Sequence, residues 1–166
     1  LCERWEQSDP KTYIFHLRPG VRWHNIPPVN GRKLKADDLV YSYNRQRTKG
    51  WPNADLLGSI DTVEALDDLT LKISLHLPDA DFLISLADPR SKIVAPEAVD
   101  ESGDLKRGPN VGTGPWLWKD TTSGMGSSFR RNPHYFESEG PYLDTLAIRF
   151  LPDAETRLAA FKNKAV

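Results

Sequence analysis

The segment TLKISLHL, at residues 70–77, indicates most clearly what kind of fold this chain adopts. Leucine and isoleucine occupy every second position, and threonine, lysine, serine and histidine occupy the positions between them. With a period of two, alternate side chains lie on opposite faces of a β-strand. The segment therefore predicts a strand with one buried face and one polar face, which Pro78 ends.

Segments on both sides of this strand extend it into a sheet. A tight turn at Asp67 and Asp68 precedes it and indicates a partner strand around residues 63–65. A hairpin is expected from 116–118 to 128–131, with glycines between its strands. Other runs of aromatic, β-branched or alternating residues predict the remaining strands, at 13–17, 21–24, 93–94 and 146–150.

Helices are expected between these strands. The helix predicted at 36–47 carries Asp37 and Asp38 in its first turn, where the helix dipole favours negative charge. The last helix follows Asp153, which is a good N-cap residue. Because strands and helices do not alternate regularly, the sequence predicts an α+β fold with a mixed, largely antiparallel sheet. Two shorter helical segments are expected at 81–87 and 96–99, and a loop at 100–112.

Composition excludes several classes of protein. Lys and Arg total 22 and Asp and Glu total 23, so the net charge of −1 argues against a partner made of nucleic acid. No stretch approaches 18 uncharged apolar residues, so no membrane span is expected. The single cysteine, Cys2, rules out an intrachain disulfide. We expect neither a secretion signal nor a lipid-attachment site in this chain.

Residues capable of catalysis or metal binding do not form recognisable motifs. The four histidines have no ligand spacing and are expected to be structural or on the surface. The paired carboxylates at 37–38 and 67–68 are explained by a helix start and a turn. We therefore predict no catalytic residue, no metal ligand and no cofactor.

Two irregular segments supply the candidate ligand-binding residues. Trp51 and Asn53 lie in a break after a basic helix end, and large aromatic side chains on loops often line ligand surfaces. Asp88 and Arg90 are the candidates on the second irregular segment, and Arg90 could bind a ligand carboxylate through two parallel hydrogen bonds. A local ion pair between Arg90 and Asp88 is the equally open alternative.

Six segments in order resemble motifs of the family 5 extracellular solute-binding proteins, which are the oligopeptide-, dipeptide- and nickel-binding components of ABC importers. Two departures are visible: Lys35 stands where the family has a threonine N-cap, and a longer proline-rich loop follows His24. The matching segments are YIFHLRPGVRWH at 13–24, KADDLVYS at 35–42, VEALDD at 63–68, VGTGPW at 111–116, RNPHYF at 131–136 and, after PYLD at 141–144, LPDA at 151–154.

The resemblance implies part of a bilobed periplasmic-binding-protein fold of type II, similar to cluster C. Residues 1–143 resemble an inserted subdomain of the first lobe, and residues 144–166 resemble the start of the return into the main part of that lobe. The rest of lobe one and all of lobe two would be absent. The loops around Trp51 and Arg90 correspond to loops that can face the cleft in the family.

The function implied is the capture of peptides or another small solute outside the cytoplasm, for import by a membrane permease. The parent protein would be periplasmic, or extracellular and attached to the membrane. A ligand-sensing domain of a regulatory protein is the alternative, and a small hydrolase is a weaker one. Open sheet edges and exposed apolar surface would also permit self-association of the chain.

Overall fold

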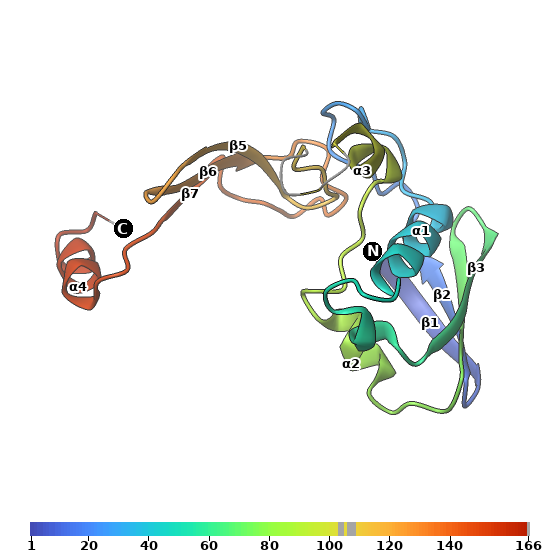
Figure 1. The fold of residues 1–166 in the computed structure, drawn as a ribbon. Coiled ribbons are helices and arrows are strands. Elements are labelled where there is room, and N and C mark those ends of the chain that lie inside the picture. Colours follow the sequence, from blue (N-terminus) through green and yellow to red (C-terminus); the bar gives the residue numbers. More distant parts are fainter. Residues whose placement is uncertain (103–104, 106–108, 166) are drawn as a thin grey trace. The chain divides into compact units, whose positions relative to one another are not determined.

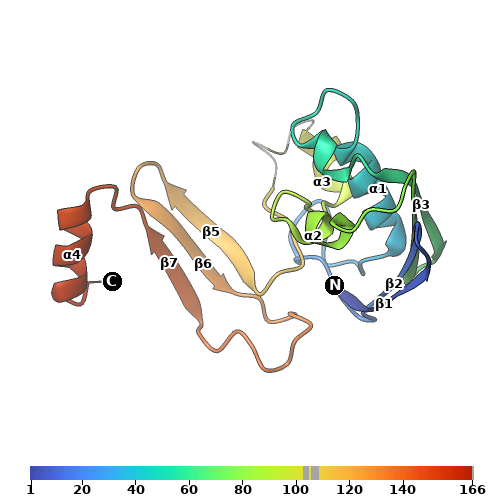
Figure 2. The same cartoon turned by 90° about the horizontal axis from the view of Figure 1, so that it is seen from below.

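A computed structural model describes residues 1–102, 105 and 109–165, so part of the predicted loop at 100–112 lies outside the described residues. The chain divides into two compact units, Leu1–Thr113 (unit 1) and Gly114–Val166 (unit 2). Figures 1 and 2 draw both units, and each is described by itself below. The predicted assignment of residues 1–143 and 144–166 to parts of a larger lobe concerns a longer protein and stays a prediction.

Unit 1 contains a four-stranded sheet in which all neighbouring strands are antiparallel. The strand predicted at 70–77 is confirmed but ends at Leu75. The backbone N–H of the next residue, His76, donates to the Ser59 carbonyl at 3.0 Å. The strand order is β1-β2-β4-β3. The strands are β1 (Cys2–Asp9), β2 (Thr12–Leu17), β3 (Ile60–Asp67) and β4 (Thr70–Leu75).

One face of this sheet forms the core of unit 1, as the alternation of residues predicts. In the register of β2 with β4, Phe15 pairs with Leu71 and Tyr13 pairs with Ile73, and all four side chains are buried. A helical layer covers this face, and its helix α1 contacts β3 and β4 (Figures 1 and 2). The layer consists of α1 (Ala36–Gln46), the short 3₁₀ turn η1 (Ala54–Leu57), α2 (Phe82–Ala87) and α3 (Pro96–Ser102).

Helix α1 begins without a hydroxyl N-cap. Lys35 occupies the N-cap position and its side chain makes no cap hydrogen bond. The carboxylate of Asp38 instead accepts a hydrogen bond of 3.0 Å from the backbone N–H of Lys35. Half of a capping box is therefore retained, with the acidic residue in the first turn satisfying the N-cap donor.

Strand β1 was not predicted from the sequence. Its segment CERWEQSD shows no alternation of apolar and polar residues, and all eight residues are exposed. It is an edge strand that pairs only with β2 along one side. Backbone pairing therefore forms this strand, and no buried face marks it in the sequence.

The predictions between α2 and the end of unit 1 need correction. Ile93 and Val94 were expected to form a short buried strand, but both are only half-buried and lie in an irregular segment. The backbone N–H of Val94 donates to the hydroxyl of Ser42 at 3.0 Å, and that hydroxyl donates to the Val94 carbonyl at 3.1 Å. The helix predicted at 96–99 is confirmed and continues to Ser102.

Residues far apart in sequence meet at His24 within unit 1. The backbone N–H of His24 donates to the carbonyl of Gly112 at 2.8 Å, and the Gly112 N–H donates to His24 Nδ1 at 3.2 Å. The His24 side chain is buried, which agrees with the structural role expected for it. This pair of hydrogen bonds ties the loop after β2 to the end of unit 1.

Unit 2 is built on a three-stranded antiparallel sheet in the order β5-β6-β7. The predicted hairpin, last strand and last helix are all confirmed. At Gly126 the φ angle is +152°, and a Cβ atom placed there would lie 2.0 Å from the Ile148 carbonyl oxygen. The elements are β5 (Trp116–Thr122), β6 (Gly126–Arg131), β7 (Thr145–Arg149) and α4 (Ala154–Lys162).

Side-chain hydrogen bonds hold the turns of unit 2. Asp153 caps α4 as predicted, because its carboxylate accepts from the backbone N–H of Thr156 at 2.7 Å. Asn132 is buried, and its side-chain amide donates to the Gly114 carbonyl at 3.0 Å and accepts from the His134 N–H at 3.0 Å. Asn132 thus joins the GTGPW and RNPHYF motifs, which supports an architectural role for both. The α+β class is confirmed, with the antiparallel strands divided between two sheets.

Candidate ligand-binding surface

The four predicted ligand-binding residues lie on two irregular segments of unit 1. Trp51 and Asn53 precede η1, and Asp88 and Arg90 follow α2. The elements η1 and α2 contact each other through a fully buried interior that contains Leu57 and Phe82. No hydrogen bond, ion pair or ring contact joins one pair of predicted residues to the other in the described part of the chain. The structure therefore places the two pairs on packed elements without direct contact between the pairs.

The Trp51 side chain is held in place although 44% of the residue is exposed. The Arg45 guanidinium lies 4.2 Å from the centre of the indole ring, within the distance of a cation–π interaction. The Trp51 backbone N–H donates to Thr48 at 3.1 Å, and Asn53 adopts a left-handed conformation with φ of 63° before η1 begins. The turn thus presents an ordered aromatic surface to solvent next to a positive charge.

Arg90 is engaged with Asp88, which is the local alternative that the sequence left open. Its Nε and Nη2 atoms donate to the two carboxylate oxygens of Asp88, each at 2.8 Å. These bonds lower the pKa of Asp88 to about 2. A ligand carboxylate that used the same two donors of Arg90 would have to displace Asp88.

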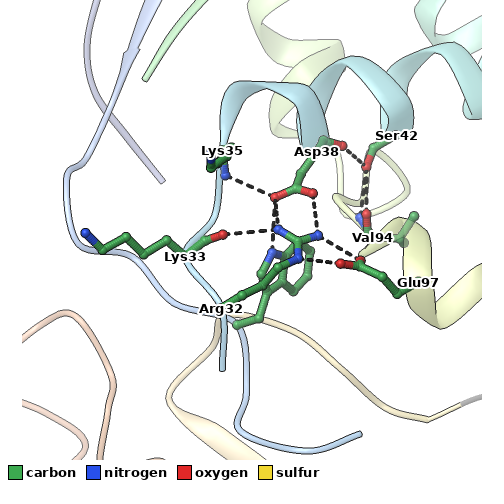
Figure 3. Close-up of polar contacts among 8 residues, drawn as sticks. Arg32, Lys33, Lys35, Asp38, Ser42, Val94 and Glu97 are labelled. Atoms are coloured by element: carbon green, nitrogen blue, oxygen red, sulfur yellow. Dashed lines mark hydrogen bonds and ion pairs between the residues drawn. The ribbon is translucent and has the colours of Figure 1, made fainter. Parts of the chain in front are cut away.

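A polar cluster around Arg32 was not predicted from the sequence (Figure 3). Arg32 donates to both carboxylate oxygens of Asp38, at 2.7 and 2.9 Å. It also donates to both oxygens of Glu97, which is 65 residues away in sequence. Hydrogen bonding to the two carboxylates raises the pKa of Arg32, and the bond from Arg32 lowers the pKa of Glu97.

Asp38 is the centre of this cluster and is 4% exposed. Besides Arg32, it accepts from the Trp23 indole Nε1–H at 3.2 Å and from the Lys35 backbone N–H. Because a buried charge is costly unless it is paired and hydrogen-bonded, these donors offset the burial of the Asp38 carboxylate. The cluster joins the loop before α1 to α1 and α3, so its role is to hold the helical layer together. In the sequence, the acidic pair at 37–38 was the only sign of this cluster, and it was attributed to the start of a helix.

Other kinds of site were sought across the described residues. Within that part of the chain, no group of three or more His, Cys, Asp or Glu side chains could hold a metal ion. None of the helices there has the length and apolar character needed to span a membrane.

Solved structures define the class of protein. The chain superimposes over its whole length on AgaA from A. tumefaciens R10 in complex with agropinic acid, with a TM-score of 0.90 and 27% identity. It matches DppA of Helicobacter pylori in complex with the peptide STSA with a TM-score of 0.85 and 27% identity. In these two cases the chain covers 33% and 36% of the other protein. The fold is therefore that of part of a periplasmic binding protein.

Sequence comparison identifies the family. The model of the bacterial extracellular solute-binding proteins, family 5 Middle, matches residues 1–166, and the chain belongs to this family. It is 33% identical to the dipeptide-binding protein of Escherichia coli K12 over 98% of this chain and 34% of that protein. It is 31% identical to the nickel-binding periplasmic protein of the same organism, over 98% of this chain and 31% of that protein. The chain spans about a third of the length of these relatives.

Proposed function

We propose that this chain is a segment of the substrate-binding component of an ABC importer, and that the parent protein captures a peptide or another small solute outside the cytoplasm. The observation that carries the proposal is the match of the whole chain to the family, together with 33% identity to a dipeptide-binding protein. The parent would act in the periplasm or outside the cell and would deliver its solute to a membrane permease.

The mechanism follows from two lobes that close on a solute, so that binding shifts the population from an open to a closed state. Residues 1–143 would belong to an inserted subdomain of the first lobe, and residues 144–166 to the return into its main part. No chemical conversion is needed, and the relatives carry the names of binding proteins. A chain that covers only part of one lobe should bind solute weakly or not at all.

Trp51 and Arg90 are the residues of unit 1 proposed to contact the solute. The exposed indole ring offers a flat apolar surface, and the Arg90 guanidinium offers paired donors to a carboxylate such as a peptide C-terminus. Asp88 would act as a placeholder that keeps Arg90 extended until a ligand carboxylate replaces it. Asn53 sits two residues from Trp51 and would add a polar contact.

Calorimetric titration with a mixture of dipeptides and tripeptides tests the proposal on both the parent protein and this chain. The parent is expected to bind at least one peptide, and the isolated chain is expected to bind at least about a hundredfold more weakly. Tight binding by the isolated chain would overturn the lobe-closure mechanism. Absence of binding by the parent to peptides and to other small solutes would overturn the assignment as a solute-binding component.

The contact residues are tested separately in the parent protein. The Arg90→Ala and Trp51→Ala variants are each expected to weaken peptide binding about tenfold or more. Trp118→Ala is the matched control, because Trp118 is exposed to a similar extent but lies in unit 2. Equal affinities in all three variants would remove Trp51 and Arg90 from the site and leave the family assignment intact.

A further inference from the structure

Unit 1 contains an apolar cavity that the predicted ligand-binding surface does not include. It has a volume of about 300 Å³ and lies between the sheet and helices α1 and α2. No charged side chain is found among its described lining residues. Its walls include Phe15 and Leu17 of β2, Leu39 and Tyr43 of α1, and Leu83 and Leu86 of α2.

The chemistry of the cavity walls selects the kind of molecule that could enter. Aliphatic side chains form most of the surface, and the rings of Trp5, Phe15 and Tyr43 contribute aromatic edges and faces. Empty apolar cavities of roughly 150 Å³ in other proteins stay dry and bind molecules the size of benzene. A cavity with about twice that volume can hold one aromatic ring with short alkyl substituents.

The cavity is reachable from solvent at the side of β1. Trp5 of β1 lines the cavity and is 48% exposed. Its ring centre lies 6.0 Å from that of Tyr13, which is buried in the adjacent strand. Trp5 therefore stands at the boundary between the interior of the cavity and water, where its ring could cover a bound molecule.

We propose that unit 1 carries a second binding site, in this cavity, for a small uncharged molecule built on a single aromatic ring. The site is separate from the surface around Trp51 and Arg90, since neither residue lines the cavity. It does not depend on the proposed transport function, because all of its walls belong to unit 1. The gain on binding comes from removing apolar surface of the ligand and of the walls from water.

Titration of this chain with toluene tests the site, with the methyl resonances of Leu83, Leu86 and Ile93 followed by NMR. We expect saturable shifts at these methyl groups, which line the cavity. The methyl groups of Leu77 and Leu158, which are exposed and lie outside the cavity, should not shift in a saturable way. Absence of saturation, or equal shifts at all five residues, would overturn the proposal.

Two tryptophan substitutions on α2 form a matched pair. Leu83→Trp would fill the cavity and is expected to reduce toluene affinity at least about tenfold. Ile84→Trp adds the same side chain at the next residue, which is exposed and does not line the cavity, so affinity should stay within about twofold of the unmodified chain. Equal affinities in these two variants would contradict the assigned location.

A cavity-enlarging variant keeps the test decisive if Leu83→Trp does not fold, as judged by its thermal unfolding. Leu86→Ala removes side-chain volume from the cavity wall. This variant is expected to bind naphthalene at least about tenfold more tightly than the unmodified chain, because the two-ring molecule then fits. Unchanged naphthalene affinity would overturn the proposal.

Discussion

Units 1 and 2 are both built on antiparallel sheets, but they differ in how much of their apolar surface they bury. Among the residues that the structure describes, every buried hydrophobic residue except Leu117 belongs to unit 1. In unit 2, Ile148 of β7 and both Leu158 and Phe161 of α4 are exposed. The strands of unit 2 nevertheless pair with their neighbours through backbone hydrogen bonds.

The difference separates two contributions to a fold. In unit 2, backbone hydrogen bonds define which strands pair and in what register. Burial of apolar side chains supplies most of the stabilisation of a domain, and that burial is concentrated in unit 1. Substitutions should therefore have large effects in the core of unit 1 and small or local effects in unit 2.

The sharpest test of this difference compares two phenylalanines. Phe82 is completely buried in unit 1, whereas Phe161 in α4 is 72% exposed. Phe82→Ala is expected to lower the free energy of unfolding by about 3–5 kcal/mol, because it leaves a cavity in the core. Phe161→Ala should change it by less than about 0.5 kcal/mol. Urea denaturation of both variants measures these values, and similar losses would contradict the difference between the units.

The next largest effect is expected at the polar cluster of unit 1. Asp38→Asn removes the buried charge to which Arg32 and Trp23 donate hydrogen bonds. It should lower the free energy of unfolding by about 2–3 kcal/mol. This loss is smaller than for a fully buried ion pair, because Arg32 is partly exposed. Asp37→Asn is the control, because Asp37 is exposed in the same helical turn. Thermal unfolding should show a clearly lower midpoint for the Asp38 variant alone.

In unit 2 the largest effect is expected at a backbone contact. Gly126→Ala would force a Cβ atom against the Ile148 carbonyl, at a φ angle that favours glycine, and should weaken the pairing of β6 with β7 by about 1–3 kcal/mol. Gly114→Ala has open space around its Cβ and should be nearly neutral. Hydrogen exchange should speed up at the β7 amides and stay unchanged at the β4 amides. Faster exchange throughout unit 1 would show that the units do not unfold separately.

The smallest expected effect is on the pH dependence of stability, through Glu97 of the polar cluster. Because Arg32 lowers the pKa of Glu97 in the folded state, this group stabilises the fold above its ordinary pKa of about 4.5. The contribution is lost as the pH falls through the lower, folded-state pKa. Glu97 is partly exposed, so Glu97→Gln should reduce the fall in stability between about pH 5 and pH 3 by less than about 1 kcal/mol. Identical pH profiles of the two proteins would exclude Glu97 as a contributor.

Sequence patterns predicted the elements that carry a local signal. The alternation at 70–77, the acidic first turn of α1 and the N-cap at Asp153 each appear in the structure at or near the expected residues. Strand β1 was missed because an exposed edge strand needs no buried face. The strand expected at Ile93 and Val94 is wrong because the Ser42 hydroxyl, 52 residues away, takes the place of a neighbouring strand for Val94.

In the candidate site, too, only the contacts between residues close in sequence could be predicted. The pair of Arg90 with Asp88 is a contact over two residues, and the sequence could therefore raise it as an alternative. The contact of Arg32 with Glu97 spans 65 residues and has no local pattern. The apolar cavity of unit 1 also combines walls from distant segments, and its residues look like ordinary core positions in the sequence. Long-range packing, which a single sequence does not reveal, decides both features.

The hydrogen bonds between His24 and Gly112 bear on how insertions affect the stability of unit 1. They close a chain loop that contains most of unit 1. The entropy cost of closing a long loop grows only with the logarithm of its length, so even a doubling adds about 0.6 kcal/mol. Insertions in exposed segments inside this loop, such as residues 77–78, should therefore be tolerated with little loss of stability.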